Sequence, residues 1–190
     1  MKKSVLYFGV LMTLLLASCT VGGNDGLDGF DGRDGLNGLD GQDGVNILGT
    51  VIDIEDSFSA ANDFSLFYEF PQTIEVFESD VVLVYILWDQ TTDNNGQAVD
   101  IWRLLPQTLI VDQGLLQYNY DHTFLDVNIF LNADFDLNTL PAGDTDNQVF
   151  RIAVLPAELA AGSKFDRGNI DTVMGLLGVE EKDIRKIKLN

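Results

Sequence analysis

A catalytic triad in this chain would have to use His122, because it is the only histidine among the 190 residues. Asp121 precedes it, but neighbouring residues of a β-strand point to opposite faces, so Asp121 is poorly placed to orient the imidazole. The sequence also lacks the Gly-x-Ser-x-Gly turn of serine hydrolases. We therefore expect His122 to face solvent at a strand end and the chain not to be an enzyme. A compact pocket lined by His122 or by convergent carboxylates would instead favour an enzyme.

Acidic residues gather in two segments where carboxylates could bind calcium. Residues 89–100 invite comparison with an EF-hand, but alignment on Gly96 puts Thr91 first and Trp102 last. An EF-hand needs aspartate first and glutamate twelfth, so the segment does not match, and its Asn-Gly pair predicts a tight hairpin turn. The calcium candidates that we keep precede an apolar run at 149–155: Asp134, Asp136, Asp144 and Asp146. The alternative is that these four are solvated turn residues.

Aromatic residues and one arginine are the other candidates for a site. Trp88, Trp102 and Tyr118 would make a sugar-stacking platform if they surfaced together, although their apolar neighbours favour core packing. Arg151 lies inside an apolar run, and a buried guanidinium requires a carboxylate partner. We expect Arg151 to be structural, with a partner that the sequence does not identify.

Cys19 is the only cysteine, which excludes a disulfide within the chain. Two lysines and a largely apolar run at residues 5–16 precede it, and that run is too short to span a bilayer. The segment Leu16-Ala17-Ser18-Cys19 resembles the lipobox of bacterial lipoproteins, in which the cysteine is acylated and becomes the first mature residue. We predict a signal peptide at residues 1–18 and a lipidated N-terminus at 19–22, with Cys19 as the lipid attachment site. Each buried acyl methylene contributes about 0.8 kcal/mol to membrane binding.

Residues 23–46 form eight uninterrupted triplets with glycine first and Asp or Asn third. Collagen requires this period because only glycine fits at the axis of the triple helix. No triplet contains proline, and Arg33 is the only cation against six aspartates, so three aligned copies would repel one another. Three interpretations stay open: a flexible tether, a triple helix nucleated by trimerisation of the following domain, and a cation-binding run of carboxylates. The spacer would reach roughly 75 Å if extended and about 25 to 30 Å as a coil.

The composition from residue 47 onward is typical of one β-rich domain, 47–190. Apolar and polar residues alternate as in half-buried strands over 64–70, 116–122 and 125–131, and the last two segments predict an antiparallel hairpin. Nearly continuous apolar runs at 81–88 and 149–155 predict core strands. We predict a mainly β fold, an antiparallel β-sandwich preceded by a collagen-like or disordered spacer.

The C-terminal segment combines a helical pattern with a basic strand. Ile170, Val173, Met174 and Leu177 recur at helical spacing, and Gly178 can end a helix there, so we predict one short helix. Residues 184–189 then predict an edge strand guarded by its lysines.

The chain is strongly acidic, with 30 acidic and 11 basic residues and a formal net charge of −19. Such a balance excludes nucleic acid as a favourable partner and is more typical of a solvated surface than of a cation site.

The lipobox, the triplets and the β-rich part together resemble the collagen-like-repeat lipoproteins of Bacteroidota, and residues 74–80 and 146–151 look like segments of that group. The resemblance implies an architecture and no catalytic residue. We predict an envelope protein, lipid-anchored at the outer membrane, with a structural, adhesive or binding role toward a protein or glycan partner. The alternatives are a periplasmic or surface hydrolase and a calcium-binding envelope protein, with calcium as the one cofactor considered. A homotrimer would follow from a triple helix.

Overall fold

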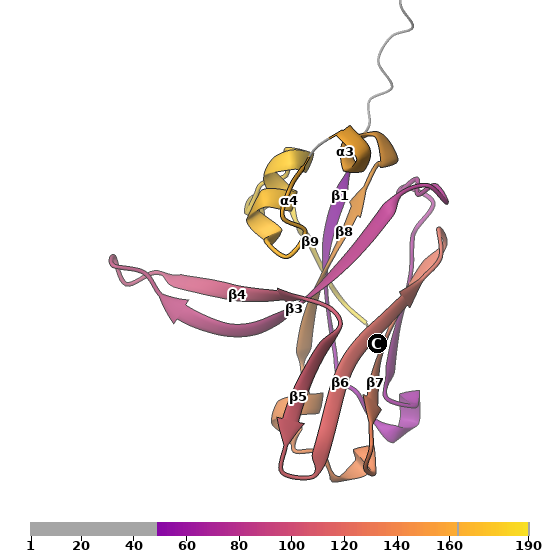
Figure 1. Cartoon of the computed structure of the whole chain (residues 1–190), viewed down its shortest axis with the longest axis vertical. Helices are drawn as coiled ribbons and strands as arrows, with labels where there is room; N and C mark the ends of the chain where they lie inside the picture. The colour runs from indigo at the N-terminus through magenta and orange to yellow at the C-terminus, as the bar shows by residue number, and fades with distance from the viewer. Residues whose placement is uncertain (1–48, 163, 190) are drawn as a thin grey trace, which may run out of the picture. The chain divides into compact units, whose positions relative to one another are not determined.

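Strands dominate the computed structural model, which describes residues 49–162 and 164–189 (Figure 1). The strands are β1 Thr50–Asp56, β2 Ser65–Glu69, β3 Val81–Thr92, β4 Ala98–Leu104, β5 Gln107–Val111, β6 Gly114–His122, β7 Asp126–Ala133, β8 Gln148–Leu155 and β9 Arg185–Lys188. One sheet has the order β4-β3-β8-β1-β9 and the other the order β2-β7-β6-β5. The predicted mainly β, sandwich-like fold is confirmed. The predicted leader, Cys19 and the spacer lie outside the described residues.

The core lies between the two sheets and is built from alternate residues of their strands. In β2, β6 and β7 the buried residues are those that the alternation predicts: Leu66, Tyr68, Leu116, Tyr118, Val127, Ile129 and Leu131. The register places Tyr118 opposite Leu131, which confirms the antiparallel hairpin of β6 and β7. Burying one side chain of this size contributes roughly 1.5–3 kcal/mol, so the inward-facing residues fix which face of each strand points to the core.

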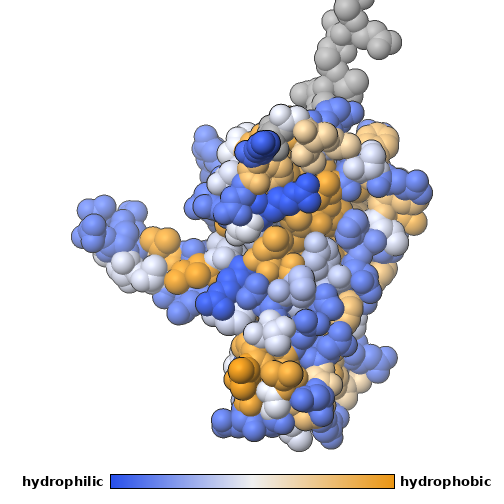
Figure 2. All heavy atoms as spheres, in the orientation of Figure 1, coloured by the Kyte–Doolittle hydropathy of each residue, from blue (hydrophilic) through white to orange (hydrophobic). Residues whose placement is uncertain are grey.

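A two-stranded arm projects from the sandwich (Figure 1). Residues 81–86 of β3 pair with β8, β4 joins on the other side at Tyr85 and Ile86, and from Leu87 onward β3 pairs with β4 alone. Asp93 closes the predicted hairpin turn, because its Oδ1 accepts hydrogen bonds from the N–H groups of Asn95 and Gln97. These bonds, the Gln97 bond first, lower the pKa of Asp93. Figure 2 shows a polar tip and apolar side chains nearer the sandwich.

Three short helices accompany the sheets: α2 Ala142–Thr145, α3 Ala157–Gly162 and α4 Ile170–Leu177. The predicted C-terminal helix is α4, where Asn169 caps the start by accepting a hydrogen bond from the N–H of Thr172. Gly178 ends the helix with a φ of 66°, a backbone conformation that glycine adopts without strain. The sequence did not predict α2 and α3, which are too short for an apolar periodicity to develop.

The predicted basic edge strand is β9, but it runs parallel to β1 and not antiparallel as a purely antiparallel sandwich would require. The reason is the direction of the chain. Because β8 ends where β1 begins, the chain passes through α3 and α4 at that end and returns beside β1 in the same direction (Figure 1).

Candidate functional site

The outer face of the five-stranded sheet carries three successive bands of side chains. The band beside α4 is apolar, and its members pack into a second core with the helix: Val51, Leu83, Ala153, Ile170, Val173 and Met174. Every second residue of a strand points to this face. The register of β3, β8, β1 and β9 then aligns these residues across the sheet into the next two bands.

The middle band holds two charged groups that are almost completely removed from water. Arg151 of β8 lies directly opposite Asp53 of β1, and their side chains are 2% and 5% exposed. Arg151 donates from Nε to Asp53 Oδ1 at 2.7 Å and from Nη2 to Oδ2 at 2.9 Å. Glu181 accepts from Nη1 and Nη2 at 2.8 and 2.7 Å. These are the carboxylate partners that Arg151 was predicted to require.

The Arg151 guanidinium is enclosed on its remaining sides. The Trp102 ring of β4 lies over it with 4.3 Å between Arg151 Cζ and the ring centroid, and Met174 Sδ is 3.4 Å from Nη1. Burial alone would lower the pKa of Arg151, but hydrogen bonds and attraction from Asp53 and Glu181 outweigh burial and raise it. The arginine therefore stays charged, and it holds β8, β1, β4 and the segment before β9 in one arrangement.

The third band is open and forms the floor of a groove of about 310 Å³. Its floor includes Leu87 of β3, Val149 of β8 and Glu55 of β1, and Glu55 lies opposite both Val149 and Lys188 in the sheet. Lys188 Nζ is 3.2 Å from Glu55 Oε1. The strand β9 thus supplies one cationic wall of the groove.

The arm supplies the opposite wall, because its outer-face residues Trp102, Asp100 and Gln90 line the same groove. Gln90 Nε2 donates to Asp100 Oδ1 at 2.7 Å, which joins the two strands of the arm. Arg151 packs on one face of the Trp102 ring, and Trp102 also borders the groove. A fixed indole beside carboxylate, amide and ammonium groups can pack on the C–H face of a sugar ring and hydrogen-bond to its hydroxyls.

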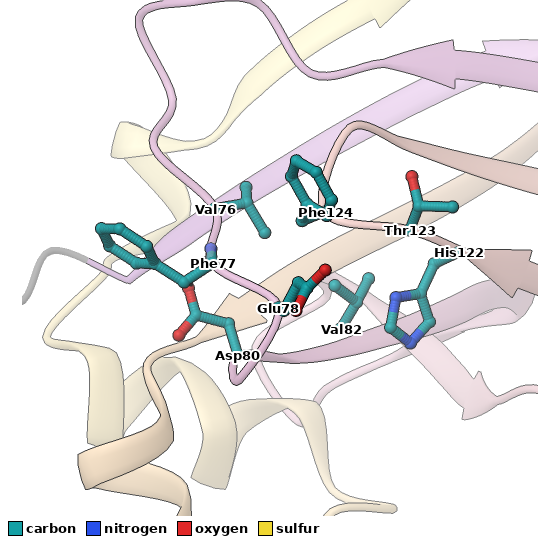
Figure 3. Close-up of a pocket in the computed structure, with 8 residues that line it drawn as sticks. All are labelled: Val76, Phe77, Glu78, Asp80, Val82, His122, Thr123 and Phe124. Atoms are coloured by element: carbon teal, nitrogen blue, oxygen red, sulfur yellow. Dashed lines mark hydrogen bonds between the residues drawn. The ribbon is translucent and has the colours of Figure 1, made fainter.

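A second depression, of about 350 Å³, lies at the end of β6 and contains His122 (Figure 3). His122 is exposed at the last position of its strand, as predicted, and stacks on Tyr120 with ring centroids 6.2 Å apart. Glu78 also lines this pocket, with Val76, Val82 and Phe124 as its apolar part (Figure 3). A pocket lined by His122 is the feature that would favour an enzyme, so its polar contacts matter.

The hydrogen bonds around the His122 pocket do not pair a base with a nucleophile among the described residues. Asp80 Oδ2 accepts from the N–H of Phe77 and Oδ1 from that of Ala157, which makes Asp80 a turn residue. The hydroxyl of Thr123 donates to Asp126 Oδ1 at 3.0 Å. The described part of the chain shows no hydrogen bond from His122 to a carboxylate or hydroxyl.

The four calcium candidates have local roles where the structure places them. Asp134 Oδ1 accepts from the N–H of Leu115 at 2.8 Å, and Asp146 Oδ1 accepts from the hydroxyl of Thr145 at 2.9 Å. Asp136 caps a 3₁₀ turn by accepting from the N–H of Asn138, and this bond lowers its pKa. For Asp144 the recorded contact is through its main-chain oxygen, which accepts from the Tyr118 hydroxyl. Within residues 49–162 and 164–189, no group of three His, Cys, Asp or Glu side chains could hold a metal ion.

The sugar-stacking alternative to core packing is wrong, because the structure separates the three aromatic residues. Tyr118 is 3% exposed and points into the core between the sheets. Trp88 continues the inward-facing alternation of Val84 and Ile86, which puts it on the inner side of the arm, where the Arg103 guanidinium lies 3.9 Å from its ring centroid. Trp102 lies on the outer side, so only this aromatic residue borders the groove. The core packing that the sequence favoured holds for Tyr118.

The comparison with known proteins found no matching family model, no matching curated protein and no matching solved structure. No helix in the described part of the chain is long and apolar enough to cross a membrane. The groove is the feature that sequence reasoning missed. The alternation of Asp53 with Glu55 and of Arg151 with Val149 in apolar strands was a signal for a partly polar outer face, but the register that assembles these residues is not local.

Proposed function

We propose that this protein is a lipid-anchored envelope protein that binds a glycan, without catalysis, in the groove between the arm and β9. The observation that carries this proposal is the groove itself. Trp102 borders it from one wall, Lys186 and Lys188 from the other, and Asp100 and Glu55 offer acceptors within the same 310 Å³. The groove stands on a sheet face and not on loops, so its geometry is preorganised.

Preorganisation follows from the buried ion pair. The Arg151 guanidinium fixes the Trp102 ring from one side, and Asp53 and Glu181 fix Arg151 in turn. A ligand that packs on this indole has little side-chain freedom to remove, and binding energy is not spent on ordering the site. Acceptors and ammonium groups around one aromatic ring suit a hydroxyl-rich ligand better than an apolar one.

Anchoring rests on the lipobox-like segment that ends at Cys19 and on the eight glycine triplets that follow it. In this proposal Cys19 is acylated, residues 1–18 are removed, and the spacer at 23–46 holds the domain away from the outer membrane. The resemblance to collagen-like-repeat lipoproteins of Bacteroidota supports the same arrangement. Replacement of Cys19 by alanine should abolish incorporation of labelled palmitate and release the protein from the membrane fraction, and unchanged labelling would refute the anchor.

Titration calorimetry tests the glycan site with oligomers of glucose, mannose and N-acetylglucosamine as probes and the full chain in detergent. We expect at least one oligomer to bind and Trp102→Ala to weaken that binding at least tenfold, since a buried tryptophan contact is typical of a binding hot spot. Trp88→Ala is the matched control, because it removes the same ring from the opposite side of the arm. Equal loss in both variants, or no binding of any oligomer, would contradict the proposal.

A hydrolase is the second candidate, and the His122 pocket is the observation that favours it. Here His122 would act as general base on water, with Glu78 across the pocket. The test is turnover of nitrophenyl esters and glycosides by the wild-type chain and by His122→Ala, a substitution that an exposed position should tolerate. Turnover that disappears in His122→Ala would establish the hydrolase, and turnover that is absent or unchanged would eliminate this pocket as its site.

A further inference from the structure

The strand β5 forms one free edge of the four-stranded sheet. Its recorded pairing is with β6, from Gln107 opposite Tyr118 to Val111 opposite Gly114. An edge strand leaves alternate N–H and C=O groups without a partner, so it is a template for another extended strand. The sequence of β5, Gln-Thr-Leu-Ile-Val, contains no charge, no proline and no glycine.

The other edges of the described sheets are guarded by charge. β9 reads Arg-Lys-Ile-Lys, β4 contains Asp100 and Arg103, and β2 ends in Glu69. Charged side chains on an edge strand are a common device against pairing between molecules. Of the four edge strands in the described part of the chain, β5 alone has no charged residue.

The β5–β6 hairpin also exposes large apolar side chains. Ile110 is 89% exposed, and Leu115, its cross-strand neighbour on β6, is 49% exposed. Figure 2 shows an apolar patch at the end of the molecule that Figure 1 assigns to this hairpin. An isoleucine this accessible gains nothing from the fold of its own chain, so the surface has the properties of a contact for another molecule.

We propose that β5 pairs antiparallel with β5 of a second copy of this chain, around a twofold axis at Leu109. Five residues then face five, and any other centre would pair fewer. Thr108 lies opposite Ile110 of the second copy, so each exposed isoleucine is covered by the other molecule. The two four-stranded sheets become one continuous eight-stranded sheet.

Charge explains why contact between two copies occurs at this strand. Copies of a chain with a net charge of −19 repel each other over most of their surfaces, and an uncharged strand is where that repulsion is weakest. Pro106 before β5 and Asp112 after it confine the pairing to the five residues between them. A twofold contact needs a self-complementary surface, and an antiparallel strand pair is self-complementary by construction.

The dimer is weak in solution, because one strand pair buries less than the roughly 1,200 Å² of a stable interface. Confinement of copies to one membrane raises their effective concentration and strengthens the pairing; that last step alone depends on the proposed anchor. The strand pairing itself is tested without a membrane, so its failure is separable from a failure of the anchor or of glycan binding.

Sedimentation equilibrium of residues 20–190, which contain every described residue, provides the test over micromolar to millimolar concentrations. We expect a monomer–dimer equilibrium that Ile110→Lys weakens at least tenfold, while Phe67→Lys leaves it unchanged. Phe67 is the matched control because it is a 58% exposed apolar residue on β2, the other edge of the same sheet. A monomer at all concentrations, a trimer, or equal effects of the two substitutions would overturn the proposal.

Cross-linking tests the register, and it does not depend on a lysine variant remaining folded. Residues 20–190 contain no cysteine, so Leu109→Cys introduces a single thiol at the proposed axis. We expect oxidation to give a disulfide-linked dimer for Leu109→Cys and much less for Phe67→Cys. Similar yields would indicate random collision and would overturn the pairing.

Discussion

Two regions of this molecule treat charge in opposite ways. The outer face of the five-stranded sheet buries Arg151 and Asp53 and gives both groups hydrogen-bonded partners. The edge of the four-stranded sheet at β5 is open to water and carries no charge at all. In the first region, buried charged groups fix the internal geometry. In the second region, charged side chains are absent although charge on an exposed edge would favour solubility. The first region is closed and rigid, and we propose that a second copy of this chain completes the second.

The largest effect should follow from breaking the closed side. Asp53→Ala leaves a buried guanidinium with one carboxylate partner instead of two, and loss of such a partner costs about 3–5 kcal/mol of unfolding free energy. Urea denaturation measures the change. Glu181→Ala is the matched control, because the Glu181 side chain is 58% exposed and its loss should cost about 1 kcal/mol or less.

Replacing both buried charges tests whether the loss in Asp53→Ala comes from the unpaired guanidinium. The double variant Asp53→Leu with Arg151→Met should recover most of the stability that Asp53→Ala loses, because a packed apolar pair has no desolvation cost. Equal losses of unfolding free energy for Asp53→Ala and Glu181→Ala would show that burial of the Arg151–Asp53 pair does not set its contribution to stability.

Alkaline pH should loosen the closed side as well. Tyr85 lies opposite Arg151 in the sheet, and burial is the main reason that its pKa is raised far above the usual value of about 10. Because the folded-state pKa exceeds the unfolded one, the stability that this group contributes is complete below pH 10 and is lost as pH rises further. Urea unfolding between pH 8 and 11.5 should show that fall.

The Tyr85→Phe variant isolates this contribution. It removes the hydrogen bond from the Tyr85 hydroxyl to the main-chain oxygen of Arg167, at a cost of about 0.5–1.5 kcal/mol near neutral pH. Its stability should fall less steeply above pH 10 than that of the wild type. A parallel pH dependence in the two proteins would assign the alkaline loss to other groups.

The smallest effect on stability is expected at β9, the charged edge of the five-stranded sheet, where it tests whether charge alone distinguishes this edge from β5. Arg185→Thr with Lys186→Thr removes two of the three cations of β9, both at exposed positions. We expect the unfolding free energy to stay within about 0.5 kcal/mol per substitution, while self-association measured by sedimentation increases. Unchanged association would mean that edge charge is not what keeps β9 apart from other molecules.

Local sequence patterns predicted the parts of the fold that depend on neighbouring residues. The alternation in β6 and β7, the Asn-Gly turn of the arm and the helix ended by Gly178 are each decided within about ten residues. The partners of Arg151 were not predictable in this way. Asp53 is 98 residues away and Glu181 is 30 residues away, and the register of β1 on β8 and the path after α4 bring them together.

The positions of the aromatic residues also depend on strand register, which local sequence patterns do not predict. Trp88 and Trp102 both lie in strands of the arm, and the register that puts Trp102 opposite Leu87 decides that the two rings lie on opposite sides of the arm. The pairing register between two strands has no local sequence pattern, so the sequence left the sugar-stacking alternative open although it predicted the hairpin itself. The groove depends on this detail, because it leaves Trp102 as its aromatic residue.

The most direct test of the proposed glycan site is the binding of glucose, mannose and N-acetylglucosamine oligomers to the full chain, compared with Trp102→Ala and Trp88→Ala. We expect binding that falls at least tenfold in Trp102→Ala and is unchanged in Trp88→Ala. Binding that both variants retain, or that the wild-type chain lacks for every oligomer, would contradict a glycan site in the groove between the arm and β9.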